Sequence, residues 1–300
     1  MSKSVEQLVE YFQRHDRWVL LTGAGISAGS GIPTYRDARG QWLRTTPIQH
    51  QEFINHPSKR QRYWGRSMVG WPGVRDARPN PIHLAVTRLE HLNRVTLIIT
   101  QNVDRLHQRA GSQQVVDLHG RLDRVCCLDC GARYEREYVQ QQLLRLNPHQ
   151  CDFSVQPRPD GDADLSDTDV ASIRPFDCEA CGGMLMPDVV FFGGSVPKAR
   201  VEACEQALQE CHGLLVVGSS LQVYSGFRFC KRAHAMGKPI VVLNEGITRA
   251  DAFADLKITD NALNILVDAV DQLLPIAPHK ELACPTRVSS GSETPFKDPA

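Results

Sequence analysis

A short apolar run that leads directly into closely spaced glycines is the feature that most constrains the fold of this chain. Residues 18–21 form the run, and Gly23, Gly25 and Ala28 follow it in a G-x-G-x-x-[GA] pattern. After a strand, such glycines let backbone N–H groups approach a pyrophosphate at the start of a helix. The pattern is weak by itself, but its place after an apolar run predicts a nucleotide site in an α/β fold.

The residues after the glycines argue against a hydride-transfer enzyme. Enzymes of the usual doubly wound type have an acidic residue about 20 positions after the glycines, at the end of a second strand, where it binds the ribose. Glu52 is the only acid between positions 40 and 62, and its neighbours do not resemble a strand end. The glycine segment continues instead into Tyr35, Arg36 and Asp37, which are residue types that contact ligands from loops.

Further apolar runs predict the remaining strands of a parallel sheet. Short runs of aliphatic residues occur at 95–99, 115–118, 214–217, 239–243 and 256–258, and the run 186–192 resumes the pattern after a cysteine-rich segment. Helical spacing of apolar residues occurs at 198–211 and 262–274. The polar or small residues that follow these runs are Gln101, Asn102, Asp104, His119, Gly218, Ser219, Ser220, Asn244 and Glu245. Because the carboxyl ends of parallel strands share one edge, we expect a single ligand crevice there.

Four cysteines form two C-x-x-C pairs, each followed by a glycine. The pairs are Cys127 with Cys130 and Cys178 with Cys181. Two such turns can place four thiolates around one ion, which predicts a closed structural zinc site. Buried thiols and thioredoxin-like redox pairs are the alternatives, but two matched pairs favour zinc. Residues 157–169, between the pairs, are rich in Asp, Pro and Gly and are expected to form an exposed excursion.

The composition predicts a soluble cytoplasmic protein. Lys plus Arg equals Asp plus Glu, at 34 each, so no bulk charge attracts the chain to nucleic acid or to a membrane surface. No run approaches the ~18 apolar residues that cross a bilayer. The first 17 residues contain Glu6, Glu10 and Asp16, unlike a signal or transit peptide. Residues 286–300 are rich in Ser, Gly, Pro and charge and are expected to be disordered.

Ordered motifs along the chain resemble those of the sirtuins, the NAD-dependent protein-lysine deacylases. The matching segments are 23–27, 30–33, 35–36, 100–107, 119–120, the two C-x-x-C pairs, 190–193, 218–221 and 243–244. They extend over roughly residues 5–274, and segments 124–131, 187–193 and 218–226 are most similar to the class II branch. An ordered set of this kind is far more specific than any single motif.

The resemblance implies a Rossmann-like large domain with a small zinc-binding module inserted into it. The expected boundaries are 1–119 and 189–285 for the NAD-binding domain and 120–188 for the module. NAD would be a co-substrate whose nicotinamide leaves, and the acyl group of a modified lysine would move to ADP-ribose. One structural zinc per chain is implied. Acylated lysine on proteins is the implied partner, and neither nucleic acid nor membrane is expected.

The resemblance also implies roles for individual residues. His119 would be the general base on a ribose hydroxyl, and Asn102 would be the second catalytic residue. The implied cofactor contacts are Gly23, Ala24, Gly25, Ile32, Tyr35, Arg36, Gln101, Asn102, Asp104, Gly218, Ser219, Ser220, Asn244 and Glu245. The implied contacts of the substrate peptide, which would add as a strand, are Val190, Phe192, Gly193, Leu221 and Val223.

Two details of the sequence bear on specificity. Sirtuins usually have Asp-Phe-Arg-Ser where this chain has Thr34-Tyr35-Arg36-Asp37, which leaves the contacts of this loop open. Tyr63 and Arg66 have the Tyr-x-x-Arg spacing that binds a carboxylate in sirtuins that prefer acidic acyl groups. A packed tyrosine and a solvated arginine are the alternative for this pair.

Two other functions are compatible with parts of the sequence. A mono-ADP-ribosyltransferase could use the same NAD pocket. A binding protein could combine the zinc module with a vestigial nucleotide site, but neither C-x-x-C turn lies in a basic, aromatic segment. The deacylase therefore remains the favoured interpretation.

Overall fold

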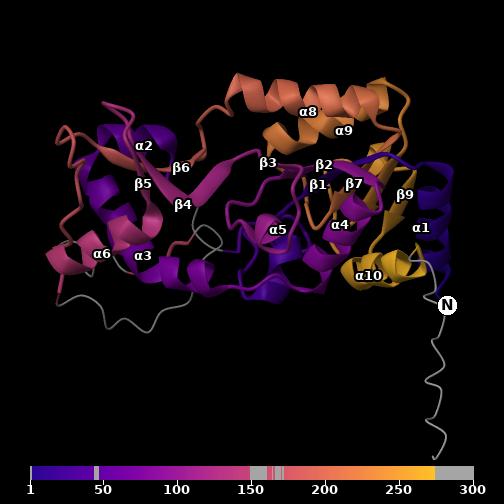
Figure 1. The fold of residues 1–300 in the computed structure, drawn as a ribbon, viewed down its shortest axis with the longest axis horizontal. Helices are drawn as coiled ribbons and strands as arrows, with labels where there is room; N and C mark the ends of the chain where they lie inside the picture. Colours follow the sequence, from indigo (N-terminus) through magenta and orange to yellow (C-terminus); the bar gives the residue numbers. More distant parts are fainter. Residues whose placement is uncertain are drawn as a thin grey trace, which may run out of the picture.

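Six of the apolar runs form one parallel sheet, in the order β3-β2-β1-β7-β8-β9 (Figure 1). The computed structural model describes residues 2–43, 47–148, 161–163, 165, 170 and 172–273. The strands are β1 (Trp18–Thr22), β2 (Val95–Thr100), β3 (Val115–Asp117), β7 (Gly213–Val217), β8 (Ile240–Leu243) and β9 (Leu256–Ile258). The predicted α/β fold with a parallel sheet is confirmed.

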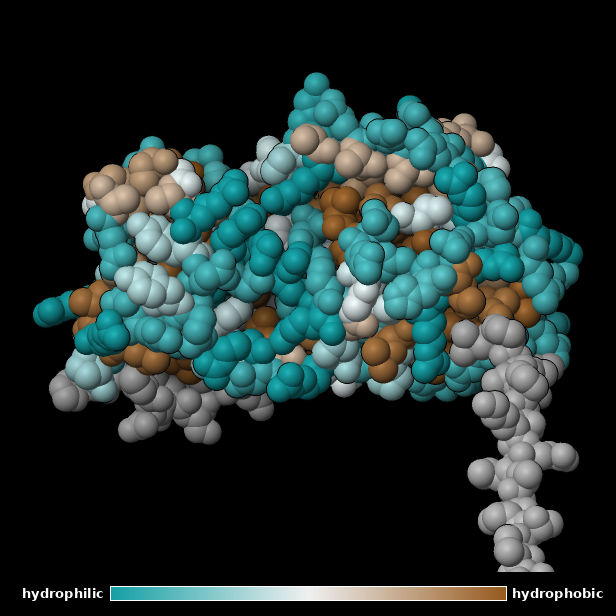
Figure 2. Space-filling model, in the orientation of Figure 1, coloured by the Kyte–Doolittle hydropathy of each residue, from teal (hydrophilic) through white to brown (hydrophobic). Residues whose placement is uncertain are grey.

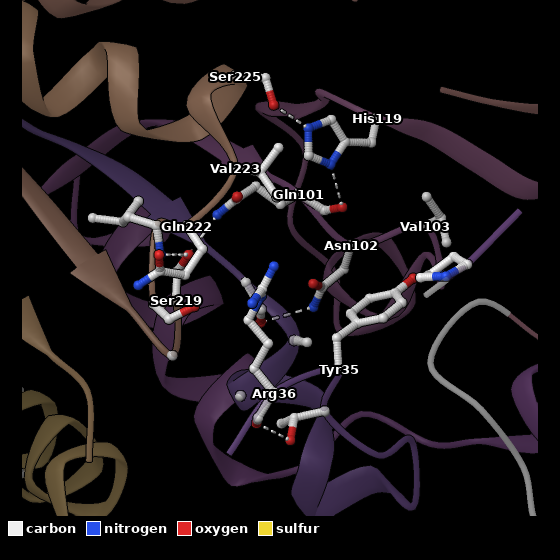
Figure 3. Close-up of a pocket in the computed structure, with 18 of the residues that line it drawn as sticks. Tyr35, Arg36, Gln101, Asn102, Val103, His119, Ser219, Gln222, Val223 and Ser225 are labelled. Carbon is white, nitrogen blue, oxygen red and sulfur yellow. Dashed lines mark hydrogen bonds between the residues drawn. The ribbon is translucent and has the colours of Figure 1, made fainter. Parts of the chain in front are cut away.

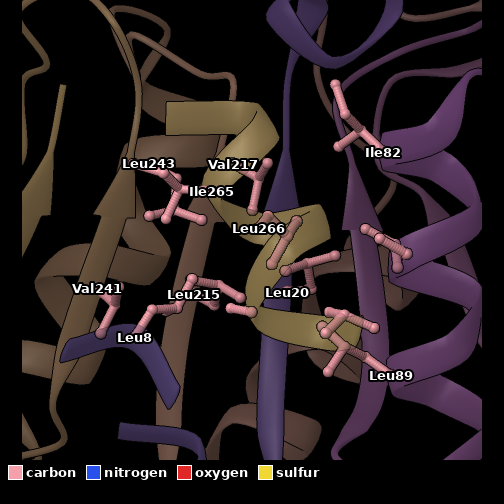
Figure 4. Close-up of a cluster of buried hydrophobic side chains, with 14 of the residues drawn as sticks. Leu8, Leu20, Ile82, Leu89, Leu215, Val217, Val241, Leu243, Ile265 and Leu266 are labelled. Atoms are coloured by element: carbon pink, nitrogen blue, oxygen red, sulfur yellow. The ribbon is translucent and has the colours of Figure 1, made fainter. Parts of the chain in front are cut away.

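Successive side chains of the central strands point to opposite faces of the sheet, and each face has its own helices (Figure 1). Leu20 packs in a cluster with residues of α1 (Lys3–Arg14), α4 (Pro81–His91) and α10 (Ala262–Leu273) (Figure 4). Its neighbours Val19 and Leu21 pack with residues of α8 (Lys198–Glu210) and α9 (Tyr224–Ala235). Burial on both faces explains why these strands have uninterrupted apolar sequences.

The strand order reverses between β1 and β7. The chain builds outward from β1 through β2 to β3, and then forms β7, β8 and β9 on the other side of β1. The connections that follow β1 and β7 therefore diverge, which opens a crevice at the carboxyl ends of these strands. The connection after β1 is a 3-10 helix, η1 (Ala24–Ser30), in place of the α-helix start that the glycine pattern predicts.

The loops that follow β1 and β7 meet backbone to backbone. Gly25 N donates a hydrogen bond to Gly218 O over 2.9 Å, and a Cβ on Gly25 would lie 2.8 Å from that oxygen. Gly218 has a φ of +62°, and a Cβ there would lie 2.6 Å from Ile26 N. Both positions need glycine, because a side chain at either one would push the loops apart.

A second, smaller sheet contains the cysteine segment. β4 (Gly120–Cys127) pairs antiparallel with β5 (Arg133–Glu135) and with β6 (Leu185–Val189). The apolar run at 186–192 thus starts in this sheet and is not a strand of the parallel one. Helices α2 (His50–Asn55), α3 (Pro57–Asp76) and α6 (Arg136–Leu146) contribute to the same hydrophobic cluster as β4. Residues 50–76 therefore pack with the cysteine module although they precede it in the sequence.

The sequence predicts an exposed excursion at 157–169, but its described part is largely buried against α3. Ala163 is 0% and Leu165 is 6% exposed, and a Cβ on Gly70 of α3 would lie 2.4 Å from the carbonyl carbon of Asp162. The prediction was wrong for these residues because composition reports average polarity, whereas the few apolar side chains of the segment pack on a helix. Residues 157–160, 164 and 166–169, and the tail 286–300, lie outside the described residues.

The outer surface on the side shown in Figure 2 is mainly hydrophilic, with hydrophobic residues in scattered patches. Within the part of the chain that the structure describes, no helix is both long enough and apolar enough to cross a membrane. The apolar side chains of the sheet are thus mostly covered by helices.

Candidate active site

A cavity of about 960 Å³ lies where the strand order reverses, at the carboxyl ends of the parallel strands. Figure 3 shows residues from several separate segments that line it. The sequence-predicted site residues on its wall are Gly23, Ala24, Gly25, Tyr35, Arg36, Gln101, Asn102, His119, Val190, Phe192, Gly193, Gly218, Ser219, Ser220, Leu221, Val223, Asn244 and Glu245. The predicted crevice is therefore present, and the segments that follow several strands of the parallel sheet form its wall.

Gln101 and Asn102 connect the strand ends beneath the cavity. Gln101 Nε2 donates a hydrogen bond to Ser219 Oγ over 2.7 Å, which joins the ends of β2 and β7 (Figure 3). Asn102 Nδ2 donates to Gly23 O and to Ser27 Oγ, each over 3.0 Å, which joins β2 to the glycine loop. The two amides thus hold the wall of the cavity in place.

Two residues predicted to contact the cofactor, Ile32 and Asp104, lie behind the cavity wall. Asp104 is 7% exposed, and its carboxylate accepts hydrogen bonds from Ser27 Oγ over 2.7 Å and from Leu106 N over 2.9 Å. Burial raises the pKa of this carboxyl group. Ile32 packs in a small hydrophobic cluster that includes Trp71. In this conformation both residues support the glycine loop from behind.

Aromatic rings line the cavity next to the loop that follows η1. Tyr35, Trp42 and Phe192 contact one another edge to face, with ring centroids 5.5 to 6.2 Å apart. The Arg36 guanidinium lies 3.9 Å from the centroid of the Trp42 ring and donates to Gly40 O over 2.7 Å. Burial lowers the pKa of Arg36, which nevertheless remains a cation at neutral pH. This loop therefore presents a stacked cation and an apolar wall to a ligand.

Thr34 and Asp37, two of the three residues that depart from the sirtuin pattern, organise the same loop. Thr34 Oγ1 donates to the carbonyl oxygen of Arg36 over 2.9 Å. Asp37 Oδ1 accepts from the backbone N–H groups of Arg39 and Gln41, over 2.9 and 2.8 Å. Their hydrogen bonds are within the loop, so the departures stabilise its conformation.

His119 projects into the cavity with both ring nitrogens hydrogen-bonded (Figure 3). Nδ1 lies 3.1 Å from the carbonyl oxygen of Gln101, and Nε2 lies 2.7 Å from Ser225 Oγ. Burial lowers the pKa of His119 to about 4; the Gln101 carbonyl opposes this shift and the nearby cation of Arg200 adds to it. The imidazole is therefore neutral at physiological pH, the state that a general base requires.

Several residues on the cavity wall were not predicted from the sequence. Among them are Trp42, Ser225 and Arg228. Ser225 and Arg228 belong to the first turns of α9, and six residues separate the end of β7 from the start of this helix. A helix that starts so soon after a central strand must present its first turn near the strand ends, and this spacing could have identified both residues. Trp42 carries no comparable signal.

The four cysteines of the C-x-x-C pairs meet in one cluster. All four Sγ atoms lie within 4.8 Å of one another, with Cys127 to Cys181 at 3.6 Å and Cys130 to Cys178 at 3.7 Å. Tetrahedral Zn²⁺ with Zn–S bonds of about 2.3 Å places its sulfurs about 3.8 Å apart. The donor set and the spacing fit a structural zinc ion with four thiolate ligands, as the sequence predicts.

The fold and the site together define an α/β enzyme with a nucleotide cavity at its switch point and a zinc-binding unit beside it. The Sir2 family matches residues 23–225 of the chain. Over 255 residues the chain is 48% identical to NAD-dependent protein deacetylase 2 of Bradyrhizobium diazoefficiens, covering 85% of this chain and 93% of the relative. This chain belongs to the Sir2 family, so the resemblance seen in the sequence is confirmed.

Other relatives agree with this assignment. Over 272 residues the chain is 44% identical to the mitochondrial NAD-dependent protein lipoamidase sirtuin-4 of Bos taurus, covering 90% of this chain and 86% of the relative. A structure solved in a study of the mechanism and regulation of Sir2 enzymes matches with a TM-score of 0.72 at 31% identity, covering 91% and 100% of the two chains. A complex of Sir2 with a p53 peptide and NAD+ matches with a TM-score of 0.69 at 27% identity, covering 91% and 98%.

Replacing one zinc ligand should release the metal and destabilise the fold. In Cys181→Ser one of the four thiolate ligands is lost, so the zinc content should drop. Because zinc binding contributes to the free energy of folding, the melting temperature should fall as well. Metal analysis and thermal unfolding measure both. The matched control is Cys126→Ser, since Cys126 lies next to Cys127 but outside the cluster, and it should retain its zinc. A Cys181→Ser protein with full zinc content would contradict the assignment.

Proposed function

We propose that this protein is an NAD-dependent protein-lysine deacylase in which His119 is the general base. The observation that carries the proposal is a neutral imidazole in a cavity at the switch point of the sheet, with its proton fixed on Nδ1 by a backbone carbonyl. Transfer of an acyl group to a ribose hydroxyl requires a base that accepts the hydroxyl proton, and a neutral imidazole can supply it. The named deacetylase and lipoamidase relatives support the same reaction class.

The proposed reaction proceeds in two stages. The carbonyl oxygen of the acyl-lysine attacks the ribose carbon that carries nicotinamide, and nicotinamide leaves. His119 then accepts a proton from a ribose hydroxyl, which attacks the carbon of the bound acyl group, and water completes the release of free lysine and acyl-ADP-ribose. Gln101 and Asn102, which hold the strand ends, would keep the ribose close to His119. The acyl peptide would lie against Val190, Phe192, Gly193, Leu221 and Val223, all of which line the cavity.

The other proposed NAD contacts follow from position on the cavity wall. The glycine loop and Arg36 would face the phosphates, and Tyr35 would border the nicotinamide. Gly218, Ser219, Ser220, Asn244 and Glu245, which follow β7 and β8, would hold the adenosine half. The cytoplasmic location and the lack of nucleic acid or membrane partners remain predictions from the sequence.

Replacing His119 should separate the two stages of the reaction. In His119→Gln, deacylation should fall by about 10²- to 10⁴-fold, the usual contribution of a general base. Exchange of labelled nicotinamide into NAD in the presence of acyl peptide should persist, because it precedes the proton transfer. Both rates can be measured on one preparation. Deacylation at the wild-type rate would remove His119 from its role, and loss of exchange together with deacylation would place that role in NAD binding.

We also propose that the acyl group is uncharged. Arg66, the cation of the Tyr-x-x-Arg pair, is 5% exposed and donates from Nε to Asp162 Oδ1 over 2.9 Å and to Ala163 O over 2.7 Å. Tyr63 lines the cavity, whereas Arg66 is not on its wall. An acidic acyl group would therefore compete with Asp162 for a guanidinium that is already neutralised. The lipoamidase activity named for the sirtuin-4 relative concerns an uncharged acyl group and agrees with this proposal.

Removing the charge of Asp162 should shift the acyl preference. In Asp162→Asn the ion pair between Asp162 and Arg66 is lost, so the ratio of succinyl-lysine to acetyl-lysine kcat/KM should rise by roughly tenfold, the scale of one charged hydrogen bond. The ratio is insensitive to the fraction of folded protein, which matters because breaking a buried pair destabilises a fold. Adding Arg66→Gln to this variant should remove the gain. A wild-type protein that prefers succinyl over acetyl would contradict the proposal.

A further inference from the structure

We propose that Ser225 is a positioning residue for His119, whose hydroxyl caps the base nitrogen and holds the ring in its reactive tautomer and orientation. When NAD and the acyl peptide bind, a ribose hydroxyl would replace the Ser225 hydroxyl as the hydrogen-bond donor to this nitrogen. The inference rests on the proposed function, because it concerns the base of that reaction. It starts from the two hydrogen bonds of the imidazole in Figure 3.

The tautomer of His119 follows from its two partners. The oxygen of a backbone carbonyl can only accept, so the contact with Gln101 O places the ring proton on Nδ1. In the neutral ring Nε2 then carries a lone pair, and the hydroxyl of Ser225 must donate to it over 2.7 Å. Among the described residues this is the hydrogen bond that the Ser225 hydroxyl makes. Both ring nitrogens are therefore fixed by hydrogen bonds.

The position of Ser225 is itself determined by close packing. Ser225 is the second residue of α9, whose N-cap is Val223. The next residue, Gly226, is buried, and a Cβ there would lie 2.6 Å from Gln101 Oε1. Glycine at this position leaves room for the end of the Gln101 side chain beside the first turn of α9. Gln101 consequently contacts His119 through its carbonyl and α9 through its side chain, which aligns Ser225 with Nε2.

The charged groups around His119 act in the same direction as the cap. Arg200 of α8 lowers the pKa of His119, and its own charge is partly balanced by Asp188, 3.9 Å away. Arg228 lies one turn after Ser225 on α9 and lines the same cavity. From β2 the contact is the uncharged Gln101. The Arg200 cation disfavours imidazolium, so the neutral ring has a lone pair that accepts a hydrogen bond from Ser225.

A hydrogen bond donated to the lone pair stabilises the neutral imidazole, so its loss should raise the pKa of His119. In Ser225→Ala we expect a rise of about one pH unit, the size of a single hydrogen bond. A histidine with a higher pKa is protonated over a wider acidic range and cannot act as a base there. The acidic limb of the kcat/KM profile for deacylation, which reports groups of the free enzyme, should therefore move to higher pH by the same amount.

The first measurement is an NMR titration of His119 in the protein without substrates. The His119 signal is the one that is missing in His119→Gln. Ser225→Ala should raise its pKa, whereas Ser225→Thr, which keeps a hydroxyl, should titrate like the wild type. Ser195→Ala is the matched control, since Ser195 lines the same cavity and is exposed, and it should leave the titration unchanged. An unshifted Ser225→Ala, or a Ser225→Thr that titrates like Ser225→Ala, would overturn the proposal.

The second measurement compares the pH dependence of deacylation with that of nicotinamide exchange. Only deacylation uses the base, so in Ser225→Ala its acidic limb should move while that of exchange stays in place. If both limbs move together, Ser225 acts on NAD binding and the proposal fails. The titration needs no turnover. A protein that lacks deacylase activity would therefore contradict the proposed function, while the titration would still decide the role of Ser225.

Discussion

The contact between the backbones of Gly25 and Gly218 is the constraint on which the active site depends. It holds together the loops that follow β1 and β7, the two strands between which the sheet reverses its order. Because neither position has room for a side chain, the two loops meet closely at the wall of the cavity. Gln101 and Asn102 then fasten the end of β2 to both loops. The cavity is thus a consequence of the strand order and of glycine at these two positions.

This arrangement also sets the chemistry of the site. Burial of His119 beside the cation of Arg200 keeps the imidazole uncharged, and its ring proton is directed to the backbone carbonyl of Gln101. A site built in this way can accept a proton from a sugar hydroxyl. Nicotinamide in such a cavity is a leaving group and does not carry electrons, which agrees with the absence of an acidic strand end between positions 40 and 62.

Features that depend on local sequence were predicted well. Continuous apolar runs identified the six parallel strands, because strands covered on both faces need no polar residues. The spacing of the cysteines identified the metal cluster, because C-x-x-C fixes the geometry within each pair. Residues that follow strands lined the cavity because the carboxyl ends of parallel strands share an edge.

Features that depend on partners far away in the sequence were missed. The pairing of β6 with β4 and the burial of Ala163 on α3 each require knowledge of what lies opposite in the fold. The hydrogen bond from Ser225 to His119 joins residues 106 positions apart and was missed for the same reason. No local sequence pattern identifies a residue that positions another side chain.

The most direct test of the proposed function is to identify the products formed from NAD when the purified protein is incubated with acyl-lysine peptides. Mass spectrometry of the reaction should find free lysine, nicotinamide and acyl-ADP-ribose in equal amounts, with acetyl and lipoyl peptides consumed in preference to succinyl and glutaryl ones. NAD that stays intact with every peptide, NAD that is reduced, or ADP-ribose attached to the protein substrate in place of the acyl-ADP-ribose product would contradict it.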